Sequence, residues 1–211
     1  EIETPTLQAV YGGASARPFT THHNAAGIPL FLRISPELYL KRALIGGFER
    51  VFEFSRNFRN EGMDKTHNPE FTLLEFYEAY ADYNDMMVRF ETIYENACIA
   101  ANGTNQVTFE GRDISFATPW PRITVKDSIK QYASIDVDVL SDDEVKDELK
   151  KIHVTMEGEF SKGRAILELF EHYVEDKLIQ PTFVIDYPKE STPLCKVHRK
   201  DPELVEQFEP Y

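Results

Sequence analysis

The sequence has few cysteines and no long apolar run. Its 211 residues include two cysteines, Cys98 and Cys195, which lie far apart and match no metal-ligand spacing. We interpret them as reduced thiols, as in a cytoplasmic protein. No apolar segment approaches the ~20 residues that span a bilayer, so no membrane association is expected. Residues 1–5 have neither a basic region nor an apolar signal core, and we interpret them as mid-domain sequence.

The common nucleotide-binding loops are also absent. The chain has no Walker A loop and no G-x-G-x-x-G motif, so any nucleotide site must be of another type. Positive charge is scarce, because 23 Lys and Arg residues stand against 36 Asp and Glu residues, a net charge of −13. Bulk electrostatics of this sign oppose binding to a phosphate backbone. A nucleic-acid substrate would have to be held locally or by another domain.

Periodic segments predict an α+β fold, an antiparallel β-sheet flanked by helices. Residues 50–61 and 70–80 alternate with the period of strands and are joined by a polar loop, so we expect an antiparallel pair. A helix is predicted to begin at Ser35-Pro36-Glu37, with a capping serine and a proline at its first position, and to end at Gly46-Gly47. Helical periodicity also covers residues 84–101 and 161–178.

The later part of the chain changes character. A short hairpin is predicted around Gly111, and capping boxes at Thr124 and Ser141 begin an acidic, helical stretch. A strand is expected at 182–186. We interpret residues 1–120 as a core, 121–180 as a helical insertion on a sheet-based core, and 181–211 as a return to that core.

The predicted strand pair carries the candidate chemistry. Arg59 and Glu61 are two residues apart and share a face, as do Glu75 and Tyr77 on the second strand. If these four side chains lie on one face of the strand pair, that face carries a guanidinium, two carboxylates and a phenol. Such a surface suits a zwitterionic ligand better than a simple anion. From the spacing alone, cross-strand ion pairs on a solvated face are the favoured interpretation of these groups.

Three further features are ambiguous taken one by one. His67 could be ordinary turn chemistry before Asn68-Pro69, and Phe71 could be ordinary core. Gly12-Gly13 permits close backbone approach to a ligand, but a lone glycine pair is usually a turn. None of them indicates a site by itself.

The residue sequences of several motifs resemble those of one family. Motif 2 of the class II aminoacyl-tRNA synthetases, in the form found in lysyl-tRNA synthetase, is similar to residues 58–62, 66–72 and 75–83. Residues 12–19 and 33–41 match the same family upstream, and Thr4-Pro5 resembles the end of motif 1. Residues 180–183 and Pro193-Leu194 also fit. The resemblance covers nearly the whole chain and favours a binding site over surface ion pairs.

The resemblance implies a role for each matching residue. Arg59 would bridge the α-phosphate of ATP and the carboxylate of lysine. Glu61 would meet the adenine amino group, and Phe71 would stack on adenine. The motif 2 loop, with His67 and Asn68, would contact the phosphates and the nucleotide. The α-ammonium of lysine would be held by Glu37 and the backbone at Gly13, and its ε-ammonium by Glu75 and Tyr77.

The resemblance also implies substrates and partners. They are lysine, ATP and tRNA(Lys), with a homodimer as the full-length form and Mg²⁺ bound by acids that would follow residue 211. Motif 3, most of motif 1 and the anticodon-binding barrel would also lie outside residues 1–211. We therefore expect this stretch alone to be unable to form lysyl-adenylate.

Two alternatives are weighed against this interpretation. One is a paralogue that attaches a lysine derivative to elongation factor P, which has a similar motif 2 but no barrel; residues 77–83 and the helical 121–180 fit the synthetase better. The other is a form that acts only as a folding or dimerisation module. Binding of ATP and lysine would separate that module from a partial active site.

Overall fold

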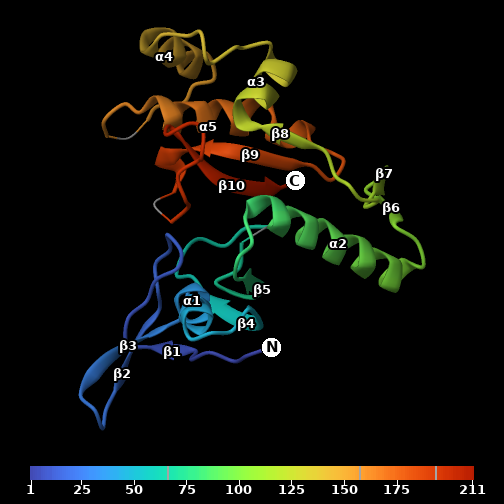
Figure 1. Ribbon diagram of the computed structural model, residues 1–211. Coiled ribbons are helices and arrows are strands. Elements are labelled where there is room, and N and C mark those ends of the chain that lie inside the picture. The colour runs from blue at the N-terminus through green and yellow to red at the C-terminus, as the bar shows by residue number, and fades with distance from the viewer. Residues whose placement is uncertain (66, 157, 193) are drawn as a thin grey trace. The chain divides into compact units, whose positions relative to one another are not determined.

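The computed structural model describes residues 1–65, 67–156, 158–192 and 194–211. Thr66 and Pro193, which belong to the motifs quoted above, lie outside the described residues. The chain forms two compact units, Glu1–Ala81 and Asp82–Tyr211. The predicted division into 1–120, 121–180 and 181–211 stays a prediction. Mostly antiparallel strands and helices make up both units, so the fold is of the α+β class (Figure 1).

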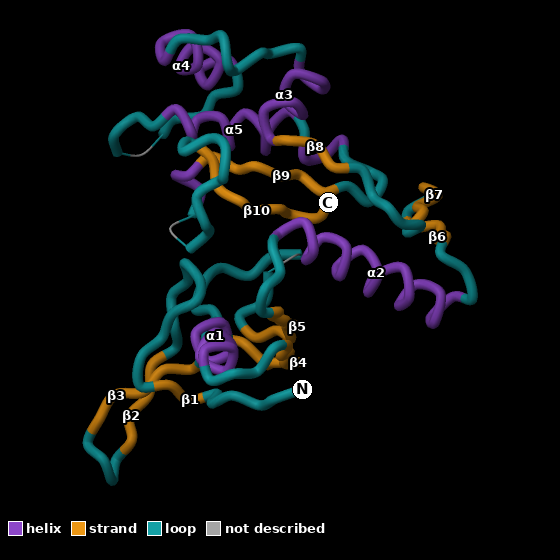
Figure 2. The backbone as a smooth tube through the Cα atoms, viewed as in Figure 1, coloured by secondary structure: helices purple, strands orange, loops and turns teal. Residues whose placement is uncertain are grey.

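The first unit contains two small sheets and one helix. Its elements are β1 (Leu7–Gln8), β2 (Thr20–His23), β3 (Ile28–Leu32), α1 (Glu37–Ile45), β4 (Arg50–Phe58) and β5 (Glu70–Glu78). One sheet has the order β1-β3-β2, and the other is the antiparallel pair β4-β5, which confirms the predicted pairing (Figure 2). This pair and α1 position the candidate site.

The predicted start of α1 needs a small correction. The N-cap is Pro36, which the sequence predicts as the first helical residue, and the helix begins at Glu37. Ser35, the predicted cap, lies one residue before the N-cap and outside the helix. The Ser35 hydroxyl nevertheless accepts a hydrogen bond from the Glu37 amide at 3.0 Å, which satisfies one of the free amides of the first turn. The helix ends before Gly46-Gly47, as predicted.

The second unit is a three-stranded sheet with helices and a hairpin. Its elements are α2 (Tyr83–Asn102), β6 (Gln106–Phe109), β7 (Arg112–Ser115), β8 (Arg122–Thr124), α3 (Val125–Ala133), α4 (Asp142–Lys151), α5 (Lys162–Tyr173), η1 (Glu175–Lys177), β9 (Phe183–Pro188), η2 (Lys189–Ser191) and β10 (Leu204–Pro210). The predicted hairpin around Gly111 is β6-β7, and the predicted strand at 182–186 is β9. The sheet order is β10-β9-β8, with β8 parallel to β9.

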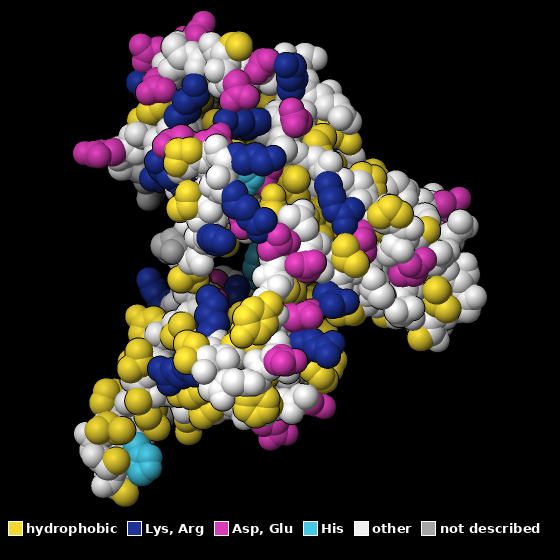
Figure 3. All heavy atoms as spheres, viewed as in Figure 1, with side chains coloured by type: hydrophobic (Ala, Val, Ile, Leu, Met, Phe, Trp, Pro, Cys, Tyr) yellow, Lys and Arg dark blue, Asp and Glu magenta, His cyan; other side chains and the backbone are white. Residues whose placement is uncertain are grey.

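Helix α5 runs along this sheet and closes the main core of the unit (Figure 1). Leu169, Phe170 and Val174 are fully buried, as the helical periodicity of 161–178 predicts, because residues three to four apart share one face of a helix. Helices α3 and α4 pack on α5. Their outer surfaces carry interspersed acidic and basic side chains (Figure 3), including the exposed pair Lys146–Asp143.

Helix α2 has a well-defined start and end. The Asp82 carboxylate accepts from the amides of Asn84 and Asp85, and the Asp85 side chain returns the contact, forming a capping box. Gly103 ends the helix in the left-handed conformation, as predicted.

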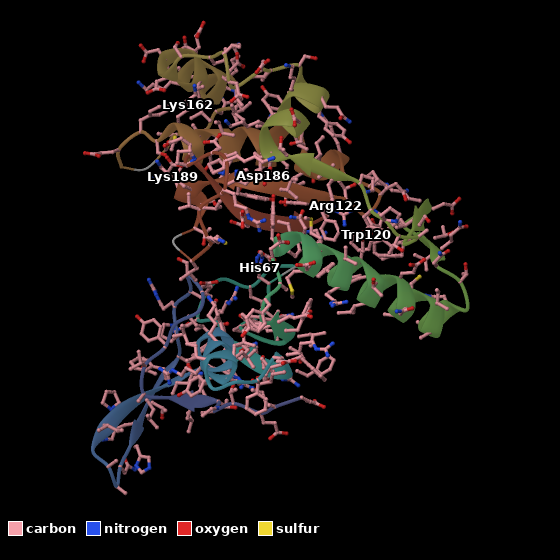
Figure 4. The ribbon with its side chains drawn as sticks, viewed as in Figure 1. His67, Trp120, Arg122, Lys162, Asp186 and Lys189 are labelled. Atoms are coloured by element: carbon pink, nitrogen blue, oxygen red, sulfur yellow. The ribbon has the colours of Figure 1, made fainter. Side chains whose placement is uncertain are left out.

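Glu91 is buried on α2 and accepts from the Trp120 amide at 2.8 Å. It also pairs with Arg122 at 3.1 Å; its partners Trp120 and Arg122 are labelled in Figure 4. None of the described helices is long and apolar enough to cross a membrane.

Candidate functional site

The site is built on the face of the β4-β5 pair that carries polar residues. On β4, Glu53, Ser55 and Asn57 are almost fully buried, whereas Phe52 and Phe54 on the opposite face are 37% and 62% exposed. The register places Glu53 opposite Glu75 and Asn57 opposite Phe71, so Glu75 and Phe71 lie on this same face. The predicted sharing of faces is therefore confirmed for β4 and β5.

The first strand ends earlier than predicted. It stops at Phe58 rather than continuing to Glu61, because the chain leaves the ladder there. The Arg59 amide still donates to the Pro69 carbonyl at 2.9 Å, but the Asn60 amide donates to the Arg17 carbonyl at 2.7 Å. The exposed Glu61 carboxylate accepts from the Arg17 amide at 3.4 Å. Glu61 thus reaches the site from a loop, beside the glycine-containing segment 11–18.

A cavity of about 250 Å³ lies at this end of the strands, and it brings five of the predicted residues together. It is lined by Arg59, Glu61, Gly62, His67, Asn68 and Phe71. The Arg59 guanidinium lies over the Phe71 ring, with Cζ 5.1 Å from the ring centroid. The Nε atom of Arg59 is buried and has no hydrogen-bond partner among the described residues. A guanidinium and an aromatic ring in one cavity suit a planar, anionic ligand.

His67 is held by its own loop. Its Nδ1 atom lies 2.9 Å from both carboxylate oxygens of Asp64, and its amide donates to the same side chain. Both side chains are mostly exposed. The Asp64 contact orients the imidazole, which lines the cavity, so the local loop explains the position of His67 (labelled in Figure 4).

A second group of predicted residues surrounds the Glu75 carboxylate. Its Oε1 accepts from the Ser35 hydroxyl at 2.7 Å, and its Oε2 accepts from the Tyr77 hydroxyl at 2.8 Å. Burial raises the pKa of Glu75, and the nearby Glu37 adds to that rise; the two hydroxyl hydrogen bonds and the charge of Arg59 oppose it. Burial and the adjacent Glu75 also raise the pKa of Tyr77, which keeps the phenol protonated as a donor. The influence of Arg59 links this group to the cavity.

The glycine loop packs against the start of α1. Gly13 has a φ of +90°, and a Cβ atom there would lie 2.8 Å from the Glu37 Cβ and 3.0 Å from the Ser35 Oγ. Only glycine permits both the conformation and this approach. Glu37 is half-buried and forms an ion pair with Lys41, one turn along the helix. Gly13 and Glu37 are thus adjacent, as the resemblance implies.

Sequence reasoning missed Ser35 as part of the site, and Arg33 and Glu53 beneath it. The Arg33 Nη1 lies 2.6 Å from the Glu53 Oε1, with both side chains almost fully buried. Thr4 donates to both oxygens of Glu53, and Arg33 donates to the carbonyls of Thr4 and Arg56. A signal was available, because Arg33 and Ser35 are two apart in an extended segment and therefore share a face.

In the second unit the described residues hold no group of three or more His, Cys, Asp or Glu side chains that could bind a metal ion. Both cysteines are free thiols, with Cys98 buried and Cys195 half-buried. All nine predicted site residues lie in the first unit.

Comparison with known proteins identifies the family of the chain. Residues 1–211 match the family of class II tRNA synthetases (D, K and N). The chain is 52% identical to the lysine–tRNA ligase of Christiangramia forsetii over 209 residues, 99% of this chain and 37% of that protein. Identity to the lysine–tRNA ligase of Clostridium novyi is 52% over 213 residues, 99% of this chain and 42% of that protein. The chain thus spans about two fifths of the length of these relatives. On this evidence, the chain belongs to the class II tRNA synthetases of the D, K and N group.

Proposed function

We propose that this chain forms the part of a lysine–tRNA ligase active site that binds lysine and ATP and joins them as lysyl-adenylate, for later transfer to tRNA(Lys). The observation that carries the proposal is the Glu75 carboxylate. It is largely buried, yet within the described part of the chain both of its hydrogen-bond donors are neutral hydroxyl groups. A buried carboxylate without a paired cation favours binding of a cationic ligand.

The neighbouring cavity supports a nucleotide beside that cation. Phe71 offers a ring on which adenine stacks, and Glu61 offers an acceptor for the adenine amino group. Arg59, with its free Nε, bridges the α-phosphate and the lysine carboxylate. His67 and Asn68 contact the phosphates from the loop. Glu37 and the Gly13 backbone take the α-ammonium, and Glu75 and Tyr77 take the ε-ammonium.

The proposed reaction needs no protein nucleophile. A lysine carboxylate oxygen attacks the α-phosphorus, a new P–O bond forms, the bond to the bridging oxygen breaks, and pyrophosphate leaves with the bonding pair. The chain contributes position and charge, and Arg59 offsets the negative charge that grows on the phosphoryl oxygens. The described residues offer no metal-binding cluster, so no step is assigned to Mg²⁺. Homodimer formation and a cytoplasmic location stay predictions from the resemblance.

Arg59→Ala tests the proposed role of the guanidinium. In the complete protein, we expect the loss of about 3 kcal/mol or more of transition-state binding, because a charged donor to the reacting phosphoryl group disappears. Lysine-dependent pyrophosphate exchange measures this loss. Glu49→Gln, a change at an exposed acid of the same unit, is the control and should leave exchange unaltered. Unchanged exchange in Arg59→Ala would refute the role.

Glu75→Gln tests the cation site separately. The substitution removes the charge and keeps the size, so the lysine KM should rise while the ATP KM stays close to that of the wild type. The two constants are measured in the same exchange assay, which makes ATP the internal control. Equal lysine KM values for the two proteins would exclude Glu75 from the lysine site.

A further inference from the structure

Two glutamates face each other across the β4-β5 pair, and their surroundings differ. Glu53 and Glu75 are direct cross-strand partners. Like charges at this spacing repel, so each carboxylate needs its own stabilisation. Glu53 has an internal cation, since the Arg33 guanidinium lies 2.6 Å away and is itself buried. Among the residues that the structure describes, the donors to Glu75 are two hydroxyl groups.

One short segment makes this difference. Arg33 and Ser35 follow β3 two residues apart, and each reaches one of the two glutamates. The Arg33 carbonyl accepts from the Phe58 amide at 2.9 Å, which fixes this segment against β4. Arg33 therefore neutralises the charge of Glu53, whereas Ser35 holds Glu75 without neutralising it.

The Ser35 hydroxyl is firmly oriented. It is 4% exposed, accepts from the Glu37 amide at 3.0 Å and donates to Glu75 at 2.7 Å. The amide belongs to the first turn of α1, where backbone N–H groups carry partial positive charge. Because hydrogen bonds in a chain polarise one another, this amide strengthens the hydroxyl as a donor to the carboxylate. A Cβ atom at position 13 would lie 3.0 Å from this hydroxyl oxygen, so the glycine there leaves the hydroxyl the space that its position needs.

We propose that Ser35 is a positioning residue for lysine recognition: its hydroxyl fixes the orientation of the Glu75 carboxylate, so that the oxygens' remaining lone pairs receive the side-chain ammonium of the substrate. This inference rests on the proposed function and adds a residue to its specificity. With Ser35 on one oxygen and Tyr77 on the other, the carboxylate cannot rotate without losing a hydrogen bond. A serine holds the Glu75 carboxylate without neutralising its charge. A cationic side chain at position 35 would instead compete with the substrate ammonium for that carboxylate.

The proposal also predicts a pH dependence. Burial raises the pKa of Glu75, and the Ser35 hydrogen bond is the largest influence in the opposite direction. Tyr77 and Arg59 also lower the pKa of Glu75, and Glu37 raises it. Glu53, whose charge is paired with Arg33, faces Glu75 from the neighbouring strand. Removing the hydroxyl should raise this pKa further. Because the ammonium binds the ionised carboxylate, lysine binding should then weaken at a higher pH than in the wild type.

The test is Ser35→Ala in the complete protein, assayed by lysine-dependent pyrophosphate exchange across a pH series. We expect the lysine KM to rise about tenfold, the scale of one hydrogen bond to a charged group. The ATP KM and kcat should stay near the wild-type values, and the acid limb of the lysine profile should move to higher pH. Ser35→Thr keeps the hydroxyl and should restore the wild-type profile.

Ser128→Ala is the matched control. It removes a fully buried hydroxyl from α3 in the second unit, whose partner is the Val125 carbonyl, so it should change stability but neither the lysine KM nor the pH limb. If Ser35→Ala loses its helical circular dichroism signal, Ser35→Cys, with a weaker donor of similar size, replaces it. Wild-type behaviour of the substituted protein would overturn the role of Ser35 and leave the proposed function intact. A wild-type protein that neither exchanges pyrophosphate nor binds lysine would overturn both.

Discussion

At the scale of single residues, the ion pair between Arg33 and Glu53 should dominate the stability of the first unit. Glu53→Gln leaves the Arg33 guanidinium buried without its countercharge, which typically costs about 3–5 kcal/mol. Urea unfolding of the wild type and the variant measures the difference. Glu70→Gln is the matched control, because the Glu70–Arg56 pair spans the same two strands but both side chains are more than half exposed. Equal losses in the two variants would contradict this prediction.

The same residues indicate how far the sequence predicts the site. Alternation along residues 50–61 and 70–80 is local, so it correctly predicts that Glu75, Tyr77 and the odd-numbered residues of β4 share a face. Which face is covered depends on a segment distant in the sequence. Arg33 and Ser35 cover the polar face, whereas Phe52 and Phe54 remain exposed. The spacing of Arg33 and Ser35 indicates that they share a face, but it does not indicate which strands they contact. The individual roles of the site residues stay predictions.

At the scale of elements, the start of α2 depends on Asp82. Its carboxylate accepts from two amides of the helix and pairs with Arg199, so Asp82→Asn should lower the melting temperature and Asp82→Ala should lower it more. The hydrogen bond from Arg199 is the main reason that the pKa of Asp82 is lowered. The stability that the charge contributes is present above the ordinary pKa of an aspartate and is lost as pH falls through the lowered value.

The difference between wild type and Asp82→Asn should therefore close at acidic pH, and thermal melts at several pH values check this. Asp142→Asn, in the first turn of α4 but outside its capping position, is the control and should show a small, separate effect. A difference between wild type and Asp82→Asn that persists unchanged at acidic pH would show that the charge of Asp82 contributes nothing.

Elements with strong local signals were predictable, and short or irregular strands were not. The capping box at Ser141 and the glycine after α2 appear where the sequence predicts them, because caps and stops depend on neighbouring residues. β8 has only three residues and is stabilised by its parallel pairing with β9. The strand β10 contains a shift in register between Val205 and Phe208, which breaks the period-two alternation that would have revealed it.

At the scale of the whole molecule, the two compact units should respond separately to loss of core packing. Leu40 on α1 and Leu169 on α5 are both fully buried, one in each unit. The same Leu→Ala change can therefore be made in each unit, and each change should lower the free energy of unfolding by roughly 2–5 kcal/mol. The single tryptophan, Trp120, is buried in an aromatic cluster of the second unit, and its fluorescence reports on that unit. Leu169→Ala should move the fluorescence transition in urea to a lower concentration.

Leu40→Ala should leave the fluorescence transition in place and move only part of the change in circular dichroism, which follows helices of both units. The reason is that each unit buries its own apolar side chains, so a cavity in one removes no contacts from the core of the other. Recording both signals on each variant separates the two transitions. If Leu40→Ala shifts the Trp120 signal as far as Leu169→Ala does, the chain unfolds as one cooperative unit and the division at Ala81 has no thermodynamic meaning.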